Sequence, residues 1–255
     1  MRCLFFLIAS TIAVAFAFGI PLQSVLEGAP KAAQEPAPKA ASKQAEAATP
    51  TWSGEPYLLT TCAASGRPIE VKGTPTTKVI AGRELKFCCS GCAAAVEKDP
   101  AKWLGKVDAA QAEAQGKIYP TEICCVGGKP LMKEAADGTK KYVGTDVIVN
   151  NRLFRVCCAE CAEKLKADPA PYALKLNEEV IKTQGDGYVF DACIVDPEGK
   201  LDGKGVKSMV IGGRLIKTCC GACEKEVRAN PTKHTAMVDA AIEAKRARMR
   251  GEAVK

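Results

Sequence analysis

The hydrophobic and polar positions of this chain repeat in three similar blocks, each with a short alternating stretch followed by a helical period. In the first block, residues 78–80 and 83–87 flank the turn Ala81-Gly82, and the equivalent turns are Asn150-Asn151 and Gly212-Gly213. Gly and Asn tolerate the positive φ values that two-residue hairpin turns require. The pattern therefore predicts one β-hairpin in each block.

A helical period follows each hairpin. Cys88, Cys92 and Val96 are spaced i, i+4 and i+8, which places them on one face of a predicted helix. Cys89 directly follows Cys88 and points roughly 100° away from that face. The other two blocks keep the same stripe, as Cys157, Cys161 and Leu165 and as Cys219, Cys223 and Val227.

A second helix is predicted after the Asp-Pro or Asn-Pro dipeptide of each block. Asp99, Asp168 and Asn230 are suited to be N-caps, with proline at the first helical position. The single histidine, His234, occupies a stripe position that is Trp or Tyr in the other blocks, so a packing role is favoured over a ligand role. The expected stripes are Trp103, Val107 and Ala110; Tyr172, Leu176 and Val180; and His234, Val238 and Ala241.

These elements predict an α+β fold of three small tandem modules, each with a β-hairpin and two short helices. The expected modules are residues 55–116, 117–184 and 185–255, the last with a basic C-terminal helix. Units of this size are close to the lower limit for a self-sufficient hydrophobic core, and only 5% of the residues are aromatic. Each module is therefore expected to need a crosslink or a bound ion.

The N-terminal part of the sequence has a different character. Residues 1–20 form an almost unbroken apolar run, typical of a signal peptide or a membrane anchor, and Cys3 belongs to this run. Residues 21–54 are rich in Ala, Pro and Lys, which predicts a disordered linker. The chain is thus expected to be exported to the periplasm or cell envelope, where an uncleaved segment would contact the membrane.

The charge of the chain could suit a nucleic-acid-binding protein. The net charge is +7, and residues 245–250 are strongly basic. Export argues against a nucleic-acid partner, and basic residues at the end of a helix complement the helix dipole. We therefore interpret residues 245–250 as a solvated helix end and expect no nucleic-acid partner; the sequence identifies no protein partner.

Cysteines provide the clearest repeated chemistry. In each block, one leading Cys is followed by an adjacent Cys pair and then by a further Cys three residues later. A Tyr precedes each leading Cys by five residues and an Arg precedes each pair by five, which indicates a duplicated module. The sets are Cys62, Cys88, Cys89 and Cys92; Cys124, Cys157, Cys158 and Cys161; and Cys193, Cys219, Cys220 and Cys223.

Three thiols that converge from a turn and from the first turn of a helix would make a metal site, because a helix N-terminus favours the thiolate that metals require. The second block offers two adjacent cysteines, Cys124 and Cys125, as the leading ligand. We choose Cys124, because Gly128-Lys129-Pro130 follows it at the same spacing at which Gly66-Arg67-Pro68 follows Cys62. Zinc and copper(I) both suit such sites. The predicted ligands are Cys62, Cys88 and Cys92; Cys124, Cys157 and Cys161; and Cys193, Cys219 and Cys223.

Each predicted site is one ligand short of a closed zinc site. A structural zinc site normally has four protein ligands, and the position that would complete a C-x-x-C knuckle holds Ser65, Gly127 or Asp196. Three explanations stay open: an adjacent Cys supplies the fourth ligand, the ion keeps an open position, or three thiolates hold a soft ion such as copper(I). The adjacent residues are Cys89, Cys158 and Cys220.

The segment F-C-C-S-G-C at residues 87–92, with Cys62-Ala-Ala-Ser-Gly before it and Asp99-Pro100 after it, resembles the YHS domain and the related TRASH domain. The resemblance covers all three modules and implies treble-clef-like metal-binding units with C-x3-C ligands. It also implies a role in handling heavy metals. The blocks depart from the pattern in two places: the second has a seven-residue insertion, and the third has Val195-Asp196-Pro197 in place of the Ser-Gly knuckle.

Two other interpretations of the cysteines compete. Exported small domains often carry a disulfide framework, but the thirteen cysteines after Cys3 are odd in number and cannot all pair within the chain. The C-x-x-C sequences at predicted helix starts suit a thiol-disulfide oxidoreductase, yet the βαβ frame of such an enzyme is absent from the pattern. One histidine leaves little for acid–base catalysis. The sequence therefore predicts a non-enzyme.

Together these observations predict an exported protein that binds heavy-metal ions through cysteine thiolates, in sequestration or trafficking. The alternative is a structural or adaptor array in which zinc ions or disulfides only hold the modules together. Chelation distinguishes the two, since it should unfold an array of that kind and leave a carrier largely folded.

Overall fold

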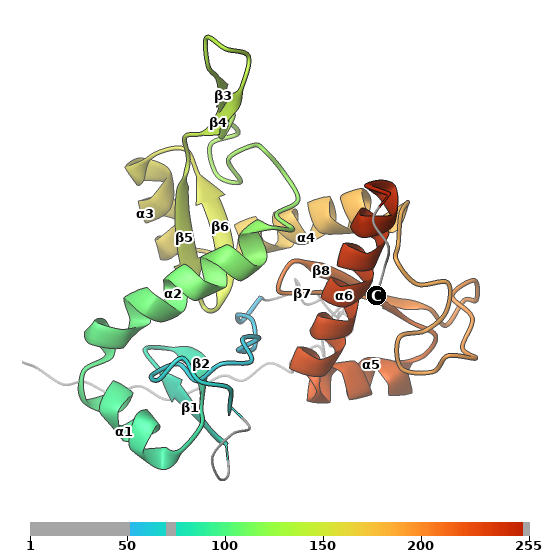
Figure 1. The fold of residues 1–255 in the computed structure, drawn as a ribbon, viewed down its shortest axis with the longest axis horizontal. Helices are drawn as coiled ribbons and strands as arrows, with labels where there is room; N and C mark the ends of the chain where they lie inside the picture. Colours follow the sequence, from blue (N-terminus) through green and yellow to red (C-terminus); the bar gives the residue numbers. More distant parts are fainter. Residues whose placement is uncertain (1–51, 70–74, 252–255) are drawn as a thin grey trace, which may run out of the picture. The chain divides into compact units, whose positions relative to one another are not determined.

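The computed structural model describes residues 52–69 and 75–251, and within them the chain has the predicted α+β class: two-stranded hairpins and six helices (Figure 1). The predictions for residues 1–51, including the signal or anchor, Cys3 and most of the linker, concern residues outside the described part of the chain. Within the described part, no helix combines the length and apolar character needed to cross a bilayer.

A hairpin followed by two helices occurs three times along the chain. In each of these three sets the hairpin is antiparallel, and its second strand leads directly into a cysteine pair. The first set is β1 (Thr76–Ile80), β2 (Arg83–Phe87), α1 (Ser90–Lys98) and α2 (Pro100–Gly116). The second is β5 (Thr145–Val149), β6 (Arg152–Val156), α3 (Ala159–Ala167) and α4 (Ala170–Gly185), and the third is β7 (Lys207–Ile211), β8 (Arg214–Thr218), α5 (Gly221–Ala229) and α6 (Pro231–Met249).

The three hairpin turns have the predicted left-handed backbone. Ala81 and Gly82 have φ values of 52° and 77°, and Asn150 and Asn151 have values of 45° and 66°. Gly212 and Gly213 follow the same geometry at 55° and 82°. Two consecutive positive φ values match the right-handed twist of the flanking strands, so these dipeptides fix the register of each hairpin.

The second block contains a fourth hairpin that the sequence did not predict. Strands β3 (Met132–Glu134) and β4 (Lys140–Tyr142) pair antiparallel within the stretch that carries the insertion. These strands are short, and their lysine and glutamate side chains are mostly exposed. They therefore lack the apolar alternation from which strands are recognised.

The starts of the second helices agree only in part with the predicted caps. Asp99 is the N-cap of α2 and accepts a hydrogen bond from the backbone N–H of Lys102. The prediction for Asp168 was wrong, because Pro169 is the N-cap of α4. Asn230 is the N-cap of α6, but its side chain donates to Glu226 and makes no capping bond.

The predicted stripe of α2 also needs correction. Ala110 is exposed, and the buried residues of this helix are Val107, Gln111 and Gln115. Two glutamines face inward because α2 lies against β5 and β6 of the next hairpin, and α4 likewise lies against β7 and β8 (Figure 1). Both α2 and α4 thus join their own module to the hairpin of the next one.

Each of the three hairpins that is followed by two helices encloses its own hydrophobic cluster with them. The central residues of each cluster come from the second strand and the helices. Arg83, Arg152 and Arg214, the predicted arginine column, open the second strand of each hairpin and are buried. Each bonds the residue 25 positions later on the second helix: Asp108, Asn177 and Asp239 respectively. The clusters centre on Leu85, Phe87 and Val96; Phe154, Val156 and Leu165; and Ile216, Val227 and Val238.

A glutamine amide connects successive modules in the same way twice. Gln115 of α2 donates to Asn151 O at 2.8 Å and accepts from Leu153 N at 2.9 Å. Gln184 of α4 makes the equivalent bonds to Gly213 O and Leu215 N, both 2.9 Å. The two amides satisfy backbone groups beside the hairpin turns, which would otherwise be buried without partners.

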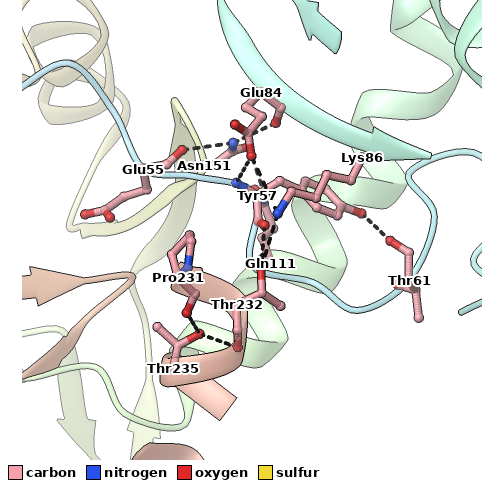
Figure 2. A network of polar contacts seen from close by, with 10 residues as sticks. All are labelled: Glu55, Tyr57, Thr61, Glu84, Lys86, Gln111, Asn151, Pro231, Thr232 and Thr235. Atoms are coloured by element: carbon pink, nitrogen blue, oxygen red, sulfur yellow. Dashed lines mark hydrogen bonds and ion pairs between the residues drawn. The ribbon is translucent and has the colours of Figure 1, made fainter. Parts of the chain in front are cut away.

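Glu55 joins the segment before the first hairpin to the other two modules. Its Oε1 accepts from Arg152 at 2.9 Å, and its Oε2 accepts from Gly212 N at 3.0 Å. Asn151 bridges the same region, because its amide donates to the carbonyls of Glu55 and Glu84 (Figure 2). Trp52 packs edge-to-face on Phe154. The predicted linker boundary at residue 54 therefore falls within a packed segment.

Replacing Gln115 with leucine should lower the free energy of unfolding by about 1–3 kcal/mol, because Asn151 O and Leu153 N would lose their partner inside the protein. Urea denaturation of the full chain measures this change. Glu113→Gln, an exposed change in the same turn of α2, is the matched control and should stay within about 0.5 kcal/mol. Equal effects of the two substitutions would contradict a clamping role for Gln115.

Candidate metal centres

The leading cysteine of each module lies in a tight turn that the backbone closes on itself. Cys62 N donates to Arg67 O at 2.7 Å, and Gly66 N returns to Cys62 O at 2.9 Å. Cys124 and Gly128 repeat these bonds in the second module. Gly66 and Gly128 both have φ of +68°, a conformation that glycine adopts without steric cost. The turn presents a buried thiol toward the hairpin.

The other two predicted ligands of each module come from the junction of hairpin and helix. Cys88 directly follows β2, and Cys92 lies in the first turn of α1. Their Sγ atoms are 3.8 Å apart. The equivalent pairs, Cys157 with Cys161 and Cys219 with Cys223, are both separated by 3.7 Å.

The structure brings the nine predicted cysteines together in three triads. In each triad all three Sγ atoms lie within 4.8 Å of one another, and each triad has at least one buried member. These are the groups within the described residues in which three or more such side chains could hold one metal ion. They are Cys62, Cys88 and Cys92; Cys124, Cys157 and Cys161; and Cys193, Cys219 and Cys223.

The third triad forms although its turn departs from the Ser-Gly pattern. Cys193 N donates to Gly199 O at 2.8 Å, one residue further along than in the first two modules, and Gly199 N donates to Asp196 O at 2.9 Å. The longer turn still delivers a buried Cys193 to Cys219 and Cys223. The Asp196 carboxylate accepts from Glu198 N and is not part of the triad.

The spacing of the thiols fits a bound ion. A tetrahedral ion with metal–sulfur bonds of ~2.3 Å holds two thiolates ~3.8 Å apart, which matches the separation of the pairs in all three modules. In the second module, a Cβ atom at Gly127 would lie 3.0 Å from Cys161 Sγ, 3.5 Å from Cys157 Sγ and 3.8 Å from Cys124 Sγ. A side chain there would crowd the space that all three sulfur atoms border.

Residues at the knuckle position differ between modules. In the first module, Ser65 N donates to Cys62 Sγ at 3.5 Å, and the Ser65 hydroxyl lies 3.7 Å from Cys88 Sγ. In the second, Gly127 N donates to Cys124 Sγ at 3.2 Å. Backbone N–H groups aimed at the leading sulfur stabilise its thiolate form.

The thiols of the first triad differ in pKa. Burial opposes ionisation of Cys62, but hydrogen bonds from Ser65 and from the backbone of Cys88 and Ala64 together outweigh it and lower the pKa of Cys62 to about 6. Burial and the neighbouring thiols raise the pKa of Cys92 to about 12. Burial likewise raises the pKa of Cys161 to about 12 in the second triad. Several thiolates cannot accumulate side by side unless a cation neutralises them.

The adjacent cysteines lie beside the triads. Cys158 Sγ is 3.8 Å from Cys157 Sγ, yet Cys158 is not among the thiols whose Sγ atoms all lie within 4.8 Å of one another. Cys158 and Cys220 are exposed, and Cys89 is half-buried. All thirteen cysteines in the described part of the chain are free thiols.

Two further residues lie apart from the triads. Cys125 is buried, with its Sγ 3.7 Å from Arg155 O, so the choice of Cys124 as the leading residue agrees with the geometry. His234 is 1% exposed, and its Nδ1 lies 2.9 Å from Asn230 O. It packs in the third module, as the stripe pattern predicted.

No protein-family model matches this chain, and searches of curated proteins and of solved structures likewise found no match. The geometry of the cysteine triads therefore carries the functional argument.

Proposed function

We propose that this chain is a metal-binding protein whose three cysteine triads bind zinc or copper(I) ions as cargo. One observation carries the proposal: in each module, three thiols from two separate stretches converge with the spacing of metal ligands. Thiolates select soft and borderline ions over magnesium or calcium.

The donor set supports two coordination modes. Three thiolates satisfy a copper(I) ion, because soft ions accept low coordination numbers with sulfur ligands. Zinc would require a fourth ligand, supplied by water or by another thiol. The triad residues would play the same part with copper(I) and with zinc. The buried turn positions the leading sulfur, and the junction of strand and helix positions the other two.

Several features of the sequence support a handling role in the cell envelope. The cysteine pattern resembles YHS and TRASH domains, and residues 1–20 resemble an export signal or anchor. Separate hydrophobic clusters in the three modules support cargo over purely architectural ions, since each module has a core besides its cysteines. Sequestration and trafficking both fit this arrangement.

A binding function is favoured over catalysis. The only histidine is buried and bonded to Asn230 O, where it cannot act on a substrate. The cysteines of the triads come from a turn and a hairpin end, and the hairpins are not part of a βαβ frame. We therefore propose that the chain is not an enzyme.

Reduced full-length protein should bind three ions per chain, one for each triad. Titration with zinc and with copper(I), followed by gel filtration and elemental analysis, measures this number. Cys62→Ser, Cys124→Ser and Cys193→Ser should each remove one ion, because two thiols bind such ions far more weakly than three.

Cys125→Ser is the matched control, since it removes a buried thiol outside the triads and should leave three ions bound. Binding of fewer than one ion per chain by the reduced wild-type protein would overturn the proposed function. Quantitative disulfides in protein purified without reductant would favour the alternative of a disulfide framework.

A further inference from the structure

In all three modules a cysteine occupies the N-cap of the first helix without acting as a cap. Cys89, Cys158 and Cys220 have extended backbones, with φ of −163°, −161° and −157°, and none makes a side-chain capping bond. N-cap positions favour Ser, Thr, Asp and Asn, whose oxygen atoms accept a hydrogen bond from the helix. Sulfur is a weaker hydrogen-bond acceptor than these oxygen atoms, so helix stability alone does not explain a repeated cysteine at this position.

These N-cap thiols are more accessible to solvent than the leading cysteines of the triads: Cys158 and Cys220 are exposed and Cys89 is half-buried. In the second module the leading residue Cys124 is 1% exposed, whereas Cys158 is exposed at the surface. Cys158 Sγ is 3.8 Å from Cys157 Sγ, close to the 3.7 Å between the Sγ atoms of Cys157 and Cys161. An ion held by the triad thus has one additional sulfur within reach, on its solvent side.

We propose that Cys89, Cys158 and Cys220 are exchange ligands, through which an ion enters and leaves the triad; this inference rests on the proposed function. They are not permanent fourth ligands, because Cys158 lies outside the set of sulfur atoms close enough to share one ion. An exposed ligand next to a half-buried one allows the ion to move outward before its bonds to the buried thiols break.

The exchange step is a ligand substitution without electron transfer. The Cys158 thiol gives its proton to solvent and forms a metal–sulfur bond, and the bond between the ion and Cys157 then breaks. Cys157 takes up a proton from solvent, so charge and protons balance. The ion, now bound to an exposed sulfur, is open to attack by the ligand of an acceptor.

The full chain carrying Cys89→Ala, Cys158→Ala and Cys220→Ala together tests this proposal. Wild type and variant are loaded with zinc or with copper(I), and transfer is followed to 4-(2-pyridylazo)resorcinol or to bathocuproine disulfonate. We expect three ions per chain in both proteins and transfer about tenfold slower or more in the variant, a change typical for loss of a group that tunes a metal site. Cys125→Ala is the control and should transfer at the wild-type rate.

Two results would overturn the exchange role. An unchanged transfer rate would show that the N-cap thiols do not participate, and a loss of bound ions in the variant would make them permanent ligands. Failure of the wild-type protein to bind any ion is a different result, because it rejects the proposed function itself.

Discussion

Alanine in place of Glu55 is expected to lower the free energy of unfolding by about 3–5 kcal/mol, the cost of leaving a buried charge without its partner. The side chains of Arg152 and Glu55 are 2% and 5% exposed, and Arg152 Nη1 lies 2.9 Å from Glu55 Oε1. In the first and third modules the equivalent arginine has an aspartate on its own second helix, but Asn177 replaces that aspartate in the second module. Glu55 therefore supplies the carboxylate that this module lacks. Denaturation with guanidinium chloride measures the loss.

Two further variants separate charge from packing. Asp239→Ala is the matched comparison: Arg214 is buried, as Arg152 is, but Asp239 is 42% exposed, so water can replace its carboxylate and the loss should be smaller, about 1–2 kcal/mol. Glu55→Leu combined with Arg152→Met removes both charges and should recover most of the stability. If Glu55→Ala cost no more than Asp239→Ala, the buried pair would not be the connection that we infer.

Chelation should produce the other large effect. Each ion stabilises the folded state by about 2.7 kcal/mol when its free concentration is one hundred times the dissociation constant, so three sites contribute about 8 kcal/mol. Removing zinc from the loaded protein should lower the melting temperature accordingly. The apo protein should nevertheless keep its helices, because most residues of the hydrophobic clusters are not cysteines and the Gln115 and Gln184 bonds do not involve the ions.

Circular dichroism and thermal melting, before and after addition of a chelator, measure both parts of this prediction. Cys62→Ser provides the matched comparison, since its first module should behave as apo protein in the presence of metal. An apo protein with the spectrum of an unfolded chain would instead identify the ions as architectural, which is the structural-array alternative.

Much of the local structure could be predicted from the sequence, because its determinants are local. Consecutive residues with positive φ at Asn150-Asn151 and Gly212-Gly213 fix the hairpins. The predicted helical face shared by Cys88 and Cys92 was wrong, because α1 begins at Ser90 and its N-cap Cys89 has an extended backbone. The two sulfur atoms meet because the strand leads directly into the helix. The convergence of Cys62 on that pair followed from repetition of the pattern. The hairpin turns and the cysteine positions could thus be identified in one block, and their recurrence in the other two blocks supported the prediction.

Contacts between modules were not predicted, because they use polar residues that ordinarily face solvent. Gln111 and Gln115 were not part of the predicted stripe of α2, yet both are buried against the turn at Asn151. Glu55 directly follows the Ala-, Pro- and Lys-rich residues 21–54, and nothing in the sequence around it predicted that it would be buried. One signal was available: Gln115 and Gln184 each lie 16 residues after the Asp of the Asp-Pro dipeptide, a repeated column of the kind that marked the cysteines.

The bond between Glu55 and Gly212 joins positions 157 residues apart in the chain. Contacts of such long sequence separation form late, because loop closure is entropically costly until local elements are in place. As the polypeptide is synthesised from its N-terminus, Arg152 emerges and meets Glu55 long before Gly212 is available. A ribosome-bound or truncated chain that ends before Gly212 should hold Glu55 by one oxygen only, and its earlier repeats should open more readily to proteases.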